Sequence, residues 1–173
     1  MKPLESKRLN AVARATISFI FATLLLAQLL LTPNKARAAE PVCAKSPLTL
    51  RKGPGSKEAI SWKVPKNMPF LRLETKKGWA KLQDLDGEIH YARAADLSSK
   101  TRCVVVKTSV AALHKDPTVS AAATDLKSLD RYTPLKRIND MREWIQVEDE
   151  AGRLAWIHES QVWKPMKVNA FSF

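Results

Sequence analysis

Histidine, cysteine and glycine are scarce in this sequence, and their positions exclude the usual catalytic and metal-binding motifs. The 173 residues include three histidines, two cysteines and five glycines. No histidine pairs with a serine or cysteine at the spacing of a nucleophile and its base, and no group of His, Cys, Asp and Glu has metal-ligand spacing. The stretch RKGPGS (Arg51–Ser56) lacks the Walker pattern of a phosphate loop. We therefore expect no enzyme activity, no cofactor and no metal, and we expect His90, His114 and His158 at the surface or at strand ends.

The N-terminal segment, residues 1–38, has the composition of a secretory signal peptide. Basic residues come first, and an uncharged stretch, Ala15–Asn34, follows with its apolar centre at Ile17–Leu31. The small residues of Ala36–Ala38 then provide a cleavage site after Ala38. The alternative is an uncleaved membrane anchor, because the uncharged stretch approaches the roughly 20 residues that span a bilayer. We expect a periplasmic or secreted protein that contacts the membrane, if at all, only through this segment when it is uncleaved.

The charge of the chain is moderately basic once the leader is removed. The whole sequence has a net charge of +12, and residues 39–173 hold 23 Lys and Arg against 16 Asp and Glu, or +7. Nucleic acid is the usual partner of a basic domain, but it is not expected for a protein that leaves the cytoplasm. Membrane phosphates, wall polymers and carboxylate-bearing wall peptides are the acidic partners outside. The alternative is that the charge only keeps the protein soluble.

Two segments of the sequence repeat each other without a gap. Residues 69–97 lie over residues 134–162 at a constant offset of 65, and LRKGP (Leu50–Pro54) lies over LHKDP (Leu113–Pro117) at an offset of 63. Matching pairs include Trp79 with Trp144, Asp84 with Asp149, Gly87 with Gly152, Tyr91 with Trp156 and Leu82 with Val147. The repeat indicates a tandem duplication of one small unit.

Each unit has the pattern of a small all-β domain. Short alternating runs such as Trp79–Gln83 are separated by the turn signals DLDG (Asp84–Gly87) and DEAG (Asp149–Gly152), so each turn marks a hairpin. RKGPGS and its counterpart HKDPTVS (His114–Ser120) are expected as loops after a first strand. Short strands without a long helical period favour a small barrel or sandwich.

The two cysteines, Cys43 and Cys103, are each expected just before the first strand of a unit. An even number of cysteines in an exported chain favours a disulfide between them. Two buried free thiols are the alternative. A catalytic cysteine is not expected, because neither residue has a histidine at a recognisable local spacing.

The first unit resembles the bacterial SH3 domain. LTLRKGPG, KVPKNMPFLRL and GWAKLQDLDGEIHYARAADL follow the pattern of that family, whereas the second unit matches more loosely, with His114 in place of Arg51. The resemblance implies two tandem SH3-like β-barrels, over residues 42–98 and 102–164. The signal-peptide helix expected over residues 1–38 precedes them, and a tail over residues 165–173 follows. Members of this family are commonly wall-targeting or protein-interaction modules, and no hydrolase domain fits beside the two units.

One tryptophan in each unit, Trp79 and Trp144, is predicted to point away from the core of its unit. If Ala80 and Leu82 face the core, Trp79 and Lys81 must face away from it, because side chains alternate along a strand. Trp144 keeps the same parity in the second unit. The tryptophans therefore either pack between the units or line a ligand groove, Trp79 with Tyr91 and Trp144 with Trp156.

Lys81 and Arg51 complete the candidate ligand-binding set, which is Arg51, Trp79, Lys81, Tyr91, Trp144 and Trp156. Trp62 and Trp163 have no counterpart in the other copy, and we expect them in core or interdomain packing. The sequence thus predicts an exported, non-enzymatic binding module for cell-wall peptidoglycan or its stem peptides. The alternative is an envelope protein–protein adaptor.

Overall fold

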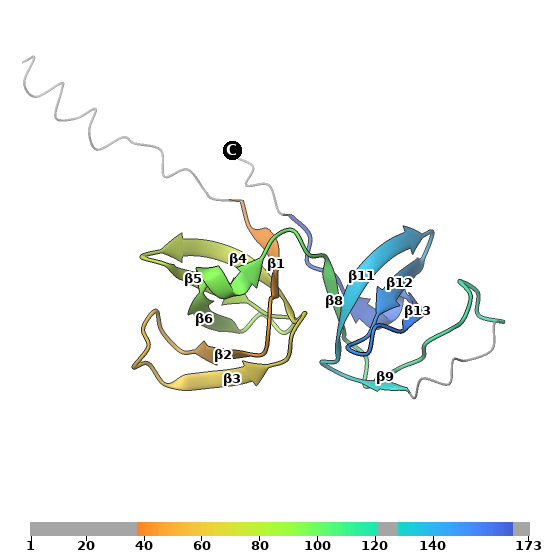
Figure 1. The fold of residues 1–173 in the computed structure, drawn as a ribbon, viewed down its shortest axis with the longest axis horizontal. Coiled ribbons are helices and arrows are strands. Elements are labelled where there is room, and N and C mark those ends of the chain that lie inside the picture. Colours follow the sequence, from red (N-terminus) through yellow and green to blue (C-terminus); the bar gives the residue numbers. More distant parts are fainter. Residues whose placement is uncertain (1–37, 121–127, 168–173) are drawn as a thin grey trace, which may run out of the picture. The chain divides into compact units, whose positions relative to one another are not determined.

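A computed structural model describes residues 38–120 and 128–167, which form two small β units (Figure 1). The predicted all-β class is confirmed. The predicted signal-peptide helix lies outside the described residues, as does most of the predicted tail. Across the described ranges, no helix is both long and apolar enough to pass through a membrane.

The first unit, residues 40–98, folds into an antiparallel sheet with strand order β3-β2-β6-β5-β4-β1-β7. A single turn of 3-10 helix, η1, connects β6 to β7. The elements are β1 Glu40–Ala44, β2 Leu48–Arg51, β3 Ile60–Val64, β4 Pro69–Lys76, β5 Trp79–Gln83, β6 Ile89–Arg93, η1 Ala94–Asp96 and β7 Leu97–Ser98.

The second unit, residues 103–163, repeats the last five strands of this order. Its main sheet has the order β13-β12-β11-β8-β14, and β9 pairs with β10 as a separate ribbon. The elements are β8 Cys103–Val106, β9 Val110–Ala111, β10 Leu129–Asp130, β11 Pro134–Met141, β12 Trp144–Glu148, β13 Leu154–His158, η2 Glu159–Gln161 and β14 Val162–Trp163.

The turns confirm the duplication at the level of the backbone. Left-handed residues recur at the offset of 65 that the sequence shows, as with Gly87 at φ 87° and Gly152 at φ 79°. Asp84 and Asp149 each accept two hydrogen bonds from backbone amides in their own turn, at 2.8–3.0 Å. A side chain that bonds the backbone two residues ahead favours a tight turn. Both predicted hairpins are therefore present, β5–β6 and β12–β13.

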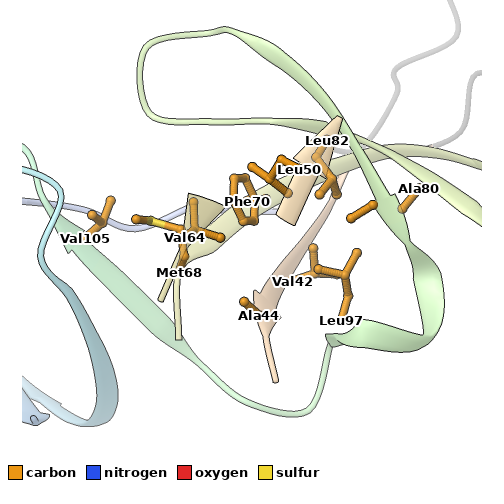
Figure 2. Packing of buried hydrophobic residues seen from close by; sticks show 11 residues of the cluster. Val42, Ala44, Leu50, Val64, Met68, Phe70, Ala80, Leu82, Leu97 and Val105 are labelled. Atoms are coloured by element: carbon orange, nitrogen blue, oxygen red, sulfur yellow. The ribbon is translucent and has the colours of Figure 1, made fainter. Parts of the chain in front are cut away.

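Each unit has its own apolar core, and strand parity is as predicted. Ala80 and Leu82 are fully buried in the first unit, and Ile145 and Val147 are 1% exposed in the second. Phe70 and Leu50 are fully buried members of the first core (Figure 2). The predicted packing role of two further tryptophans is confirmed, because Trp62 and Trp163 both contact this first core.

Cys43 and Cys103 form a disulfide, with their Cα atoms 6.2 Å apart. The expectation that each cysteine precedes the first strand of its unit is wrong, since Cys43 lies inside β1 and Cys103 begins β8. All four residues of β8 are buried. A strand covered on both faces shows no alternation of apolar and polar residues, so its sequence lacks the usual strand signal.

The disulfide lies on the surfaces of β1 and β8 that face away from the core of their own unit. Val42 and Ala44, which flank Cys43, belong to the first core, so the Cys43 side chain points away from that core. In β8, Val104 and Val106 belong to the second core, whereas Val105 joins the first. The Cys103 side chain, which has the parity of Val105, therefore also points out of its own unit.

The turn between β5 and β6 makes a further polar contact with the second unit. The Asp86 carboxylate accepts hydrogen bonds from Tyr132 Oη at 2.5 Å and from Arg131 Nη2 at 2.5 Å. The Tyr132 ring meets Trp62 edge to face, with centroids 5.5 Å apart. The hydrogen bond from Tyr132, followed by the Arg131 guanidinium, lowers the pKa of Asp86 below its ordinary value.

We predict that Asp86→Asn destabilises the protein at neutral pH and not in acid. A lowered pKa in the folded state means that the ionised carboxylate contributes stability above the unfolded pKa of about 3.9, and that this contribution is lost as the pH falls through the folded value. The contact is exposed, so the expected loss is about 0.5 kcal/mol at pH 7. Urea unfolding of both proteins at pH 7 and at about pH 2.5 measures it. Asp130→Asn, at an exposed position, is the control and should change the free energy of unfolding little at either pH. An equal loss of stability from Asp86→Asn at both pH values would contradict the role assigned to the Asp86 carboxylate.

Candidate functional site

The candidate residues of the first unit lie side by side on one surface of its sheet. In the ladder, Tyr91 of β6 pairs with Arg51 of β2 on one side and with Lys81 of β5 on the other. Trp79 pairs with Arg93, which places Trp79 diagonally next to Tyr91. The intervening residues of β5 are buried in the core, so these side chains lie on the opposite surface. We call this surface the first face, formed by Arg51, Trp79, Lys81, Tyr91 and Arg93.

Two contacts organise the first face. The Arg93 guanidinium lies over the Trp79 ring, 4.6 Å from its centroid. Arg51 Nη1 donates a hydrogen bond to the backbone oxygen of Glu58 at 2.6 Å, which holds that side chain against the β2–β3 loop. Trp79, Lys81 and Tyr91 are half-buried. Aromatic rings beside guanidinium and ammonium groups provide a surface for planar or apolar groups and for carboxylates.

The equivalent surface of the second unit has a different composition. We call it the second face, formed by His114, Trp144, Gln146, Trp156 and His158. Trp156 pairs with Gln146 and forms an isolated bridge with His114, and Trp144 pairs with His158. The Trp144 ring receives edge contacts from His114 at 5.0 Å and from His158 at 5.3 Å, and this residue is only 7% exposed. Trp144 is therefore a packed side chain, whereas Trp156 is half-buried.

The expectation that every histidine lies at the surface or at a strand end is wrong for His90. This residue of β6 is buried, with Nδ1 3.0 Å from Ser61 Oγ and Nε2 3.1 Å from Asp84 Oδ2. The sequence gives no sign of it, because Ser61 is 29 residues away on β3. Asp149 holds the same turn in the second unit, where Ala155 replaces His90. The Ser61–His90–Asp84 chain therefore ties the β5–β6 turn of the first unit to its edge strand β3.

The candidate residues of the first unit form a partly exposed sheet surface and not the wall of a deep hollow. Three hollows of about 490, 400 and 540 Å³ are lined by other residues, mostly around the β12–β13 turn and around the disulfide. In residues 38–120 and 128–167, no group of three or more His, Cys, Asp or Glu side chains could hold a metal ion. The first face thus offers shape and charge to a ligand that lies across the strands.

Comparison with known families assigns the fold of both units. The profile of the family described as "Bacterial SH3 domain" matches residues 44–99 and again residues 107–164. The two β units are therefore tandem SH3-like domains, as the resemblance predicts. No curated protein sequence matches this chain.

Three solved structures share a partial likeness at low identity. They are NlpC2 from Trichomonas vaginalis (10% identity, 73% of this chain, 48% of that chain, TM-score 0.32), an NlpC/P60 family protein from Bacillus cereus (12%, 72%, 56%, 0.33) and NlpC1 from Trichomonas vaginalis (9%, 77%, 48%, 0.32). The chain spans about half the length of each of these proteins.

Proposed function

Because the chain belongs to the bacterial SH3 domain family, we propose that it is an exported, non-enzymatic module that binds cell-wall peptidoglycan through the stem peptides. Bacterial SH3 domains are binding modules, typically for cell walls. Export is supported by the signal-peptide composition of residues 1–38 and by the Cys43–Cys103 disulfide, which suggests an oxidising compartment. Cleavage after Ala38 would release the two domains into the periplasm or the medium.

The observation that carries this proposal is the register of the first face. Arg51, Tyr91 and Lys81 stand in one row across β2, β6 and β5, with Trp79 diagonally adjacent. Large rigid aromatic rings provide contact area at little entropic cost. Cations beside them can hold peptide carboxylates by charge-assisted hydrogen bonds. Wall stem peptides present both amide backbone and carboxylates, so they match this surface.

Co-sedimentation with purified sacculi tests the proposal. The protein should pellet with sacculi at about 20 mM salt, where charge interactions are strong, and should be partly released at about 0.5 M salt. A chain that stays in the supernatant at low salt, while a disulfide assay and circular dichroism show that it is oxidised and folded, would refute wall binding.

A second candidate function, an envelope protein–protein adaptor, is favoured by apolar residues at the border of the first face. Ile60 pairs with Arg51 and is 52% exposed, and Ile89 at the start of β6 is 38% exposed. Apolar and aromatic residues with arginine are typical of the centre of protein interfaces. After complete digestion of the wall, an adaptor would still be bound to its partner protein in the extract. A wall-binding module would be free of any partner protein in the same extract.

A further inference from the structure

The two faces keep their aromatic positions and differ in every cationic one. Trp79 and Tyr91 correspond to Trp144 and Trp156, so the ring scaffold is duplicated. The three basic residues are replaced by two histidines and a glutamine. Arg51 corresponds to His114, Lys81 to Gln146 and Arg93 to His158.

The cations of the first face are not neutralised by ion pairs. Among the described residues, none forms an ion pair with Arg51, Lys81 or Arg93. Glu74 is the neighbour of Lys81 in the β4–β5 ladder, but the two side chains form no ion pair. These three cations therefore keep their charge available to a ligand.

Basic side chains away from the two faces form ion pairs in both units, as Arg72 does with Glu40 in the first unit. Lys136 pairs with Glu148 at 2.9 Å, and Arg153 pairs with Asp149 at 2.6 Å. The two units do differ in net charge: residues 40–98 contain eleven Lys and Arg against seven Asp and Glu, whereas residues 103–163 contain eight against nine.

From this contrast we infer that the protein binds one carboxylate-bearing peptide per chain, on the first face, and that the second face is not an equivalent site. That the peptide comes from the cell wall rests on the proposed function. That it carries a carboxylate and binds to the first face is inferred from the residues of that face. Adjacent strands lie about 4.8 Å apart, so Arg51 and Lys81 are rooted on either side of Tyr91, about 10 Å from each other. The Tyr91 ring therefore lies between two cations, Lys81 on β5 and Arg51, whose guanidinium is held at the β2–β3 loop, and a carboxylate above the ring lies between the two positive charges.

The second face lacks what such a ligand needs. Gln146 has no charge to offer in the position of Lys81, and both imidazoles are engaged with the Trp144 ring. The acid Glu143 stands where the first unit has Gly78, and its carboxylate is 3.8 Å from His158 Nε2. A negative charge beside the second face disfavours a second carboxylate.

Substitutions at equivalent positions of the two faces, made in the full chain, test the inference. The probes are a pentaglutamate peptide, muropeptides released from purified sacculi, and the same muropeptides after conversion of their carboxylates to amides. Calorimetry should give one site per chain for pentaglutamate and for the untreated muropeptides. Lys81→Gln, which gives the first face the residue of the second, should weaken binding about tenfold, the effect of losing one charge-assisted hydrogen bond. The matched control, Gln146→Glu, should leave affinity within about twofold.

The outcomes separate this inference from the proposed function. Pentaglutamate that binds through Lys81 while muropeptides do not bind would uphold the carboxylate site and refute wall recognition. The inference would be overturned by two equal sites per chain, or by a loss of affinity from Gln146→Glu equal to that from Lys81→Gln. It would also be overturned if the amidated muropeptides bound with full affinity or if no probe bound. Unchanged thermal unfolding of both variants ensures that the affinities compare folded proteins.

Discussion

Replacement of Cys43 and Cys103 by alanine is expected to lower the free energy of unfolding by about 4 kcal/mol. The disulfide closes a loop with a sequence separation of 60 residues, and on the chain-entropy model a loop of this length stabilises the folded state by that amount. Both cysteines are buried, at 3% and 5% exposure, so their substitution also removes apolar contact. Since small β units bury a modest core, a loss of this size is a large part of the stability of such a domain.

Urea unfolding of the oxidised protein, the reduced protein and the double alanine variant measures this effect. Dithiothreitol should shift the midpoint of the natural chain toward that of the variant and should leave the variant itself unchanged. A difference below about 1 kcal/mol between the oxidised and reduced chains would mean that packing around β1 and β8, and not loop closure, supplies the stability.

Trp79→Ala is expected to weaken binding to sacculi by about 30-fold or more. Truncation of an aromatic residue at the centre of a binding surface commonly costs about 2 kcal/mol or more, and about 1.4 kcal/mol corresponds to a factor of ten in affinity. The Arg93 guanidinium, which lies 4.6 Å above the ring, would also lose its support. The affinity is measured by co-sedimentation over a range of sacculus concentrations.

Trp156→Ala is the matched control for this experiment, because Trp156 is half-buried and belongs to the second face. It should leave sacculus binding within about twofold. Trp144→Ala is unsuitable as a control, since Trp144 is packed between two histidines and its truncation is expected to cost about 3–5 kcal/mol of stability. Equal losses of binding from Trp79→Ala and Trp156→Ala would show that both faces take part.

The repeat and the alternation within strands could be predicted from the sequence because both are local patterns. Turn residues with positive φ recur at the predicted offset of 65. In β5, Leu82 is buried and Trp79 lies on the opposite, half-buried surface, as the alternation predicts. The Cys43–Cys103 pair could be predicted from cysteine number and export alone. The register that brings Arg51 next to Tyr91 and Lys81 could not, because it depends on strands far apart in the sequence.

Three features escaped prediction for physical reasons. The strand β8 and the last three residues of β1 are buried on both faces and show no alternation. His90 is buried through contacts with Ser61 and Asp84 that no local spacing reveals. Trp144 has the parity of an outward side chain and is nevertheless buried, since histidines from β13 and from the segment after β9 cover it.

The central claim is that the first face of a doubled β unit is the ligand surface, and nuclear magnetic resonance spectroscopy tests it most directly. On titration of the full chain with soluble muropeptides, the indole N–H signal of Trp79 and the backbone amides of β5 and β6 should shift in proportion to occupancy. The indole signal of Trp156 should stay in place. Shifts confined to the second unit or to residues around the disulfide, with Trp79 unperturbed, would contradict the account.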